Sequence, residues 1–144
     1  MSEKSVSTVI IDAPLADVEA ALFTIEAYPE WLSSIKKADV IERDSSQRVV
    51  KAKLAIDAGM MKDRVTLDYD WSAAPATLSF SMDEADLLTQ MDGVYTLKAI
   101  DSDSTEVTYE LTVAVGMPVP AMMITKAQKQ TIDAALKELA ERVG

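Results

Sequence analysis

The chain has 144 residues, and its 14 lysines and arginines against 24 aspartates and glutamates give a formal charge of −10. It contains no histidine and no cysteine, but it has eight methionines. This composition excludes disulfides, thiolate nucleophiles, iron–sulfur clusters, Cys- or His-based metal sites and a Ser-His-Asp triad. Proton chemistry would have to use Asp, Glu, Lys, Tyr or water, and we expect neither a metal nor a cofactor.

Charge and hydropathy argue against two classes of partner. Nucleic-acid binding needs a basic face, and the longest basic run here is Lys36-Lys37. No apolar run approaches the ~20 residues of a membrane span, and no apolar signal segment follows Met1-Ser2-Glu3-Lys4. We therefore expect a single domain over residues 1–144 that is cytoplasmic, is not inserted in a membrane and is a monomer or a homodimer.

The first part of the chain predicts one strand and two short helices. Residues 5–11 are rich in β-branched side chains, which favour a strand. Asp12-Ala13-Pro14 is typical of a helix start. The apolar residues that follow it recur at helical spacing: Leu15, Val18, Leu22 and Ile25. Tyr28-Pro29-Glu30 is a second start signal, for a short helix that runs through Ile35.

In the middle of the chain the hydrophobic period changes to two. Apolar and polar residues alternate in six segments, which predicts antiparallel strands with one apolar and one solvated face. These segments lie near residues 40–43, 50–57, 61–71, 78–82, 91–99 and 107–115. The connections are short and carry turn residues, so we expect a meander.

A long helix is predicted at the end of the chain. Residues 121–143 contain neither Gly nor Pro, and Gln128 and Thr131 interrupt an apolar face formed by Ile124, Ala135, Leu136, Leu139 and Val143. The order of elements predicts an α+β fold in which a curved antiparallel sheet wraps around this helix. Because a helix covers only part of a curved sheet, a ligand cavity can remain between them.

This order and several short motifs resemble the helix-grip domains of the START-related (SRPBCC) superfamily. The motifs are Ile11-Asp12-Ala13-Pro14 with Asp17-Val18, Tyr28-Pro29-Glu30-Trp31, Gly93-Val94-Tyr95-Thr96-Leu97, Pro118-Val119-Pro120 and Leu136-Lys137-Glu138-Leu139. Within the superfamily the chain is similar to the polyketide cyclase/dehydrase and lipid transport branch, which is related to the coenzyme-Q-binding START domains. The resemblance implies an apolar ligand between sheet and long helix, and either transport or polyketide cyclisation or dehydration.

The inward phase of the strands and the start of the long helix supply candidate ligand-binding residues. Methionine suits an adjustable pocket, although ordinary core packing is the alternative for any one of them. An inward tyrosine needs a backbone, water or ligand partner for its hydroxyl. The resemblance places the region of Trp31 at the pocket entrance. The candidates are Trp31, Tyr69, Trp71, Phe80, Met82, Met91, Tyr95, Met117, Met122 and Met123.

Asp63 is an acidic residue on the inward phase of its strand. If buried, it would have a raised pKa and could act as an acid or base. Because it closely follows the expected turn at Ala58-Gly59, we expect it to stay solvated. Asp63 and Tyr69 are the two catalytic candidates, and neither is assigned a role. The segment 101–106 lacks the glycine and distant glutamate of a calcium loop and predicts a hairpin turn.

The sequence therefore predicts a protein that binds, and transports or sequesters, an apolar molecule such as a lipid, an isoprenoid or quinone, or a polyketide. The alternative is a polyketide cyclase or dehydratase that uses Asp63 or a tyrosine. Related cyclases often place an Arg or His in the pocket. Here histidine is absent and Arg64 is on the outward phase, which favours binding over catalysis. A third class, an interaction domain, would require an exposed apolar patch.

Overall fold

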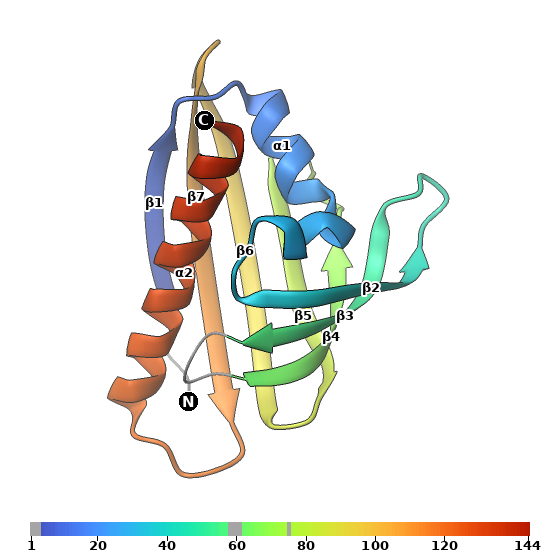
Figure 1. Cartoon of the computed structure of the whole chain (residues 1–144), viewed down its shortest axis with the longest axis vertical. Helices are drawn as coiled ribbons and strands as arrows, with labels where there is room; N and C mark the ends of the chain where they lie inside the picture. The colour runs from blue at the N-terminus through green and yellow to red at the C-terminus, as the bar shows by residue number, and fades with distance from the viewer. Residues whose placement is uncertain (1–3, 58–61, 75) are drawn as a thin grey trace.

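A computed structural model describes residues 4–57, 62–74 and 76–144 (Figure 1). After strand β1 (Ser5–Ile11) come helix α1 (Leu15–Phe23) and the 3-10 helix η1 (Ile25–Glu30). Six further strands and the long helix α2 (Ala121–Val143) follow: β2 (Ile35–Arg43), β3 (Val49–Asp57), β4 (Lys62–Asp70), β5 (Thr77–Ala85), β6 (Leu88–Asp101) and β7 (Ser104–Val115).

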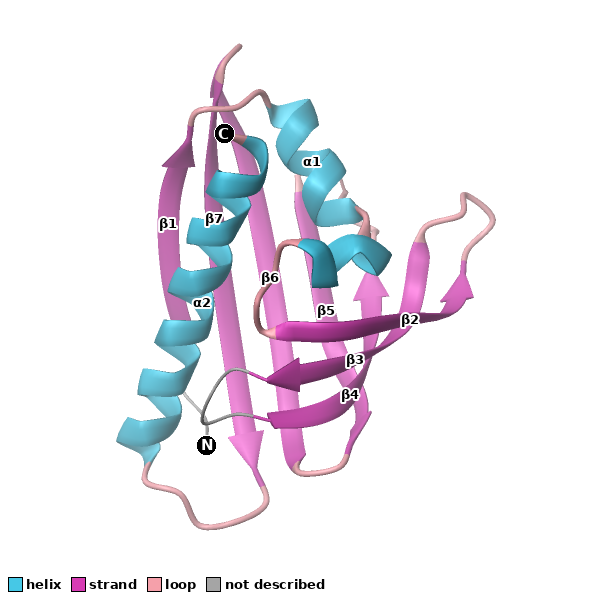
Figure 2. Cartoon of the chain, viewed as in Figure 1, coloured by secondary structure: helices cyan, strands magenta, loops and turns pink. Residues whose placement is uncertain are grey.

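The strands form one antiparallel sheet in the order β1-β7-β6-β5-β4-β3-β2. From β2 to β7 every strand pairs with its neighbour in sequence, as expected for a meander. β1 pairs with β7 at the far edge, with Ser5 opposite Leu111. In Figure 2 the ribbons of β2, β3 and β4 run across the long strands β5, β6 and β7, so the sheet is strongly curved. Register shifts in β2 and β4 fit that bend. The predicted α+β class is confirmed.

The apolar face of the sheet packs against both helices. α2 contacts β1, β7 and α1. Val18 and Leu22 of α1 and Ile132, Leu136 and Leu139 of α2 are fully buried against the sheet. Alternate residues of β7 are buried, as the period of two predicts. Within the described part of the chain, no helix is long and apolar enough to cross a bilayer.

The polar residue in the middle of the apolar face of α2 has a structural explanation. Gln128 is buried, and its Oε1 accepts the backbone N–H of Val113 at 2.6 Å. Its Nε2 donates to Ser5 Oγ at 2.9 Å. Val113 lies two residues beyond Leu111, the β7 partner of the first residue of β1. The glutamine side chain therefore continues the hydrogen bonding of β7 where the β1 ladder begins and ties α2 to the sheet.

The predicted second helix is wrong in its position. The 3-10 helix ends at Glu30, and Ile35 is already the first residue of β2, paired with Ile56. The N–H groups of Trp31 and Leu32 both donate to the carbonyl of Tyr28, which closes the last turn. The helical spacing of Ile35 was misleading because this residue is buried through strand pairing.

Two turns are tight. β5 and β6 are separated only by Asp86-Leu87, so both strands reach further than the alternation indicated. β6 and β7 meet at a turn in which Asp101 Oδ1 accepts the N–H of Asp103 at 2.8 Å. The predicted hairpin at 101–106 is confirmed, whereas the predicted turn at Ala58-Gly59 lies outside the described residues.

Candidate ligand-binding site

Four tyrosines line one small cavity between the sheet and α2. They are Tyr28 of η1, Tyr69 of β4, Tyr95 of β6 and Tyr109 of β7, and they are all the tyrosines in the chain. The cavity has a volume of about 40 Å³, room for no more than a few water molecules. The remaining lining is mostly apolar: Leu32, Ser34, Ile35, Leu54, Ile56, Leu67, Phe80, Met91, Thr131 and Ala135. None of the described residues that line it carries a charge.

The tyrosine hydroxyls differ in their partners. The Tyr28 hydroxyl donates to the carbonyl of Leu22 at 2.5 Å. Tyr95 and Tyr109 stack with ring centroids 4.0 Å apart. Tyr69 contacts the ring of Phe80, with centroids 5.8 Å apart, and is only 7% exposed. Its hydroxyl has no hydrogen-bond partner among the residues that the structure describes.

Burial also fixes the protonation state of this cluster. Desolvation raises the pKa of all four tyrosines well above the ordinary value, and neighbouring tyrosines raise the pKa of Tyr28, Tyr69 and Tyr95 further. The hydroxyls therefore stay neutral at physiological pH. They can donate hydrogen bonds, but the cavity offers no anionic base among its described residues.

A second, larger pocket lies at the open end of the fold. It has a volume of about 150 Å³ and lies between the ends of β6 and β7 and the first turns of α2. Its lining is mostly apolar: Lys62, Leu87, Leu88, Val113, Val115, Met117, Val119, Met123, Ile124, Ala127 and Gln128. We call this the mouth pocket. On its rim Leu87 and Met117 are each 54% exposed and Met123 is 45% exposed.

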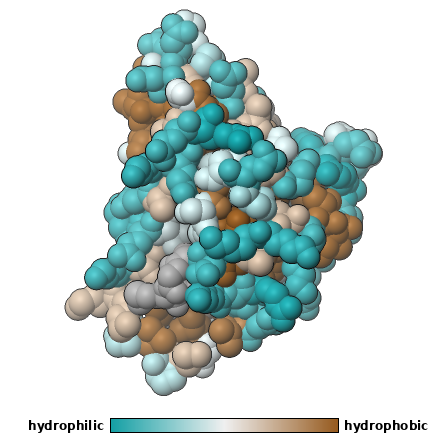
Figure 3. All heavy atoms as spheres, in the orientation of Figure 1, coloured by the Kyte–Doolittle hydropathy of each residue, from teal (hydrophilic) through white to brown (hydrophobic). Residues whose placement is uncertain are grey.

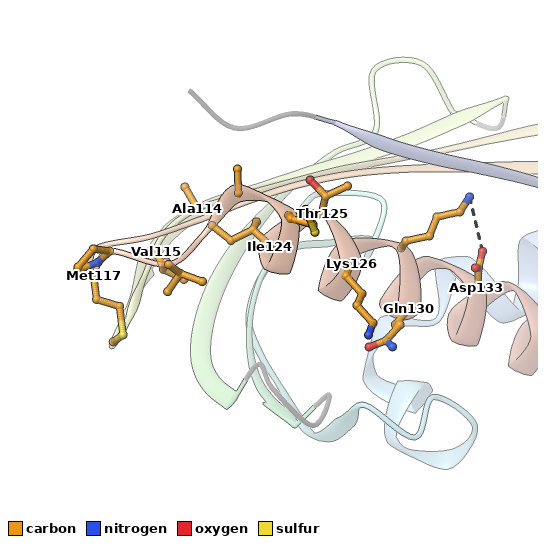
Figure 4. A pocket seen from close by; sticks show the side chains of 13 residues that line it. Ala114, Val115, Met117, Ile124, Thr125, Lys126, Gln130 and Asp133 are labelled. Atoms are coloured by element: carbon orange, nitrogen blue, oxygen red, sulfur yellow. Dashed lines mark ion pairs between the residues drawn. The ribbon is translucent and has the colours of Figure 1, made fainter.

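The outer surface near the start of α2 is also apolar. In Figure 3 brown and tan residues gather at the end of the molecule where Figure 1 places the start of α2. An open groove of about 950 Å³ lies there. Figure 4 shows Met117, Ile124, Lys126 and Gln130 along it. Its far end carries an ion pair between Lys129 and Asp133, with Nζ and Oδ1 3.9 Å apart. Met122, which also lines it, is the most exposed of the large apolar side chains described.

Asp63 is not solvated, so that expectation is wrong. It is 9% exposed, and its carboxylate accepts four backbone N–H groups, those of Arg64, Asp86, Leu87 and Leu88, at 2.7 to 3.0 Å. Burial opposes ionisation, but these four donors hold the pKa of Asp63 below its usual range. The carboxylate therefore fixes the β5–β6 turn, which carries the rim residue Leu87. Asp63 does not line either the cavity or the mouth pocket.

The structure brings most of the sequence-predicted ligand residues to two places. Tyr69, Phe80, Met91 and Tyr95 line the tyrosine cavity, and Met117 and Met123 line the mouth pocket. Met122 joins Met117 in the outer groove.

Three candidates lie elsewhere. The Trp71 indole N–H donates to Val49 O at 2.7 Å, and its ring packs edge-on against Phe23. Trp31 packs edge-on against Tyr28 and lines a groove near the end of α2 rather than the cavity. Met82 is half-buried against the core and lines none of the pockets described here.

Sequence reasoning did not assign Tyr28 and Tyr109 to the site, nor the α2 residues that follow Met123. Ala127, Thr131 and Ala135 are small, lie four residues apart and face the mouth pocket or the cavity. Such spacing places them on one face of the helix. A stripe of small residues within an apolar helix face is therefore the signal that would have indicated where space remains against the sheet.

Comparison with known proteins agrees with this geometry. A START superfamily protein from Mycobacterium smegmatis has 23% identity and a TM-score of 0.92, with 97% of this chain and 96% of that chain covered. A protein from Thermus thermophilus has 19% identity and a TM-score of 0.83, with 97% and 96% covered. The Zhui aromatase/cyclase from Streptomyces sp. R1128 has 15% identity and a TM-score of 0.79, with 98% and 93% covered.

These structural matches confirm the helix-grip fold. No match is found among curated proteins. Residues 2–144 match the family model described as "Polyketide cyclase / dehydrase and lipid transport". The chain therefore belongs to the polyketide cyclase/dehydrase and lipid transport family.

Proposed function

We propose that this protein binds an apolar small molecule between α2 and the curved sheet, as a carrier or a sequestering protein. The observation that carries the proposal is the apolar rim: Leu87, Met117 and Met123 surround an apolar pocket and expose about half of their surface. Large exposed apolar side chains around a concavity mark interaction sites. Lipids, isoprenoids or quinones, and polyketides are the classes that such a site suits. We further propose that it acts in the cytoplasm as a single-domain monomer or homodimer.

Binding requires the site to expand. Ligand pockets usually have volumes of ~300–1,000 Å³, whereas the mouth pocket measures about 150 Å³ and the tyrosine cavity about 40 Å³. Met91 and Met123 line the two spaces, and methionine side chains change rotamer at low cost. The small side chains of Ala127 and Ala135 leave space on the α2 side of the mouth pocket and of the tyrosine cavity. A ligand that enters at the rim would displace these methionines and join the two spaces.

The alternative, a cyclase or dehydratase, has less support from the geometry. Such chemistry needs a proton donor and acceptor at the substrate. The Asp63 carboxylate is engaged by four N–H groups of the β5–β6 turn and does not line the cavity. The Tyr69 hydroxyl favours this alternative because it lacks a protein partner among the described residues, and it could serve as an acid. A base is not available in the described lining.

The neutral fluorescent probe N-phenyl-1-naphthylamine tests the proposal. We expect its emission to rise on mixing with the protein and to fall when apolar compounds from a lipid extract displace it. Ala127→Trp fills the mouth pocket and should abolish binding, whereas Ala134→Trp, on the exposed side of the same helix, should not. Native mass spectrometry then identifies the compounds retained. Absence of probe binding together with absence of any retained apolar compound would contradict the proposal.

A further inference from the structure

The tyrosine cavity holds polar groups that packing alone does not require. The Tyr69 side chain is more than nine-tenths buried, yet its hydroxyl has no partner among the residues described. No fully buried side-chain oxygen among the described residues lacks a hydrogen-bond partner, so the Tyr69 hydroxyl is not sealed in the core. Tyr69 lines the cavity, so its donor is available to a molecule inside.

Two further tyrosines line the same cavity as Tyr69. The rings of Tyr95 and Tyr109 stack with centroids 4.0 Å apart, and both side chains are buried. This pair can supply a second neutral donor to a molecule in the cavity. Tyr28, by contrast, already donates to the carbonyl of Leu22.

The described lining of the cavity carries no charged residue, which restricts the ligand groups that can accept hydrogen bonds from the tyrosines. Neither lysine nor arginine is among the described residues that line the cavity, so an ionised carboxylate there would lack a counter-ion. Burying such an anion costs far more than two neutral hydrogen bonds return. A carbonyl oxygen is neutral, has two lone pairs and can accept from two donors at once.

We propose that the ligand is a neutral apolar molecule whose carbonyl oxygen enters the tyrosine cavity and accepts a hydrogen bond from Tyr69, with the stacked pair Tyr95 and Tyr109 as the source of a second donor. The apolar remainder extends past Met91 toward the mouth pocket. This inference rests on the proposed binding function and narrows its ligand class to ketones, quinones and esters rather than fatty acids.

A matched set of probes tests the ligand class. 2-Undecanone, methyl decanoate and decanoate have similar apolar chains, and each is titrated against bound N-phenyl-1-naphthylamine at pH 7.5. We expect the ketone and the ester to displace the probe at concentrations at least tenfold lower than decanoate does. If decanoate displaces it as well as the ester, the polar group does not enter an uncharged cavity, and the inference is overturned.

Tyr69→Phe tests the hydrogen bond, and Thr105→Val is its control because that buried hydroxyl donates to the carbonyl of Ala13 and does not line the cavity. Tyr69→Phe should weaken 2-undecanone binding about three- to tenfold and leave the affinity for the hydrocarbon-like probe unchanged. Thr105→Val should change neither. With carbonyl-labelled ketone, the infrared carbonyl stretch of the complex should shift to higher frequency in Tyr69→Phe alone, since a hydrogen bond lowers that frequency.

The outcomes separate the inference from the proposed function. If the probe and 2-undecanone bind but neither affinity nor carbonyl stretch responds to Tyr69→Phe, the cavity holds water only and the inference is wrong while binding stands. If neither the probe nor any of the three compounds binds, the proposed function itself fails.

Discussion

The ring of Phe80 lies directly over the backbone of Gly93. The two residues are paired across β5 and β6, and a Cβ atom built at Gly93 would collide with the ring. Because glycine has no side chain, the ring can fold across the neighbouring strand and form a wall of the tyrosine cavity. Glycine is therefore required at position 93, because the Phe80 ring lies too close to the backbone there for a side chain.

Gly93→Ala should destabilise the protein by about 1–3 kcal/mol, because a methyl group there forces the Phe80 ring out of its position. Urea unfolding followed by circular dichroism measures the loss. In a Phe80→Ala background the same substitution should cost much less, and the double-mutant cycle gives the coupling. Equal losses in both backgrounds would show that the ring and the glycine do not interact.

Asp63→Asn should destabilise by about 2–4 kcal/mol, since the amide group would present N–H donors to the N–H groups of the β5–β6 turn. The matched control is Asp86→Asn in the same turn. Its carboxylate pairs with Arg64 at 3.1 Å on the surface, where the partners are 57% and 67% exposed, so little change is expected. Similar losses for the two variants would contradict the role given to Asp63.

The lowered pKa of Asp63 predicts that part of the folding stability is lost at acid pH. Its pKa is lowered in the folded protein, so its stabilising contribution is complete above the unfolded-state pKa of about 4. That contribution is lost as the pH falls from there through the folded-state pKa. Unfolding free energy measured between pH 6 and pH 2.5 should therefore fall less steeply in Asp63→Asn than in the parent protein. Parallel curves would exclude this linkage.

Gln128→Leu should cost about 1–3 kcal/mol, because the N–H of Val113 would lose its acceptor in a buried position. Amide hydrogen exchange gives a local readout: the Val113 amide should exchange faster, while Leu111 keeps its protection. Gln130→Leu on the exposed face of α2 is the control and should leave both amides unchanged. An unaltered Val113 rate in Gln128→Leu would mean that another group replaces the glutamine.

The tyrosines should ionise only when the protein unfolds. Their folded-state pKa values are raised, so the neutral cluster stabilises the protein fully below the unfolded-state pKa of about 10. That contribution decreases as the pH rises from there toward the folded-state values. Absorbance at 295 nm should thus rise together with loss of the circular dichroism signal. Ionisation with a midpoint near pH 10 in a folded protein would contradict burial of the cluster.

Tyr69→Phe and Tyr28→Phe should differ in their effect on stability. Tyr69→Phe removes a buried hydroxyl that has no protein partner among the described residues, so the melting temperature should stay the same or rise. Tyr28→Phe leaves the Leu22 carbonyl without its donor and should cost about 1 kcal/mol. Differential scanning calorimetry of both variants compares them. A clear loss in Tyr69→Phe would mean that the protein itself uses the hydroxyl.

The strands and the final helix could be predicted because their apolar periods are regular. Residues 5–11 and 121–143 were located with the same bounds as β1 and α2. The helix after Tyr28 was misplaced because Ile35 continues the helical spacing although it is buried by strand pairing. β2 is an edge strand in which no residue after Ile35 is buried, so its alternation is weak.

The sequence could predict site residues only on the strands, where the alternation decides which side chains face the inside of the fold. Tyr69, Phe80, Met91 and Tyr95 were identified because alternate residues of a strand face the same side. The tyrosine cavity also needs Tyr28 from a different element, and the state of each hydroxyl depends on partners such as Leu22 that no periodicity reveals. Asp63 was misjudged because its partners are backbone groups of a turn more than twenty residues later in the chain.

The pairing of β1 with β7 has a consequence for how the chain folds as it leaves the ribosome. Strands β2 to β6 can each pair with a strand that is adjacent in sequence soon after synthesis. β1 can pair only after β7 has been synthesised, because Ser5 lies opposite Leu111. Until β7 appears, β1 has no strand partner, and the apolar face of the growing sheet has no α2 to cover it. Completion of the fold thus depends on its last two elements, and the nascent meander is the stage most exposed to aggregation.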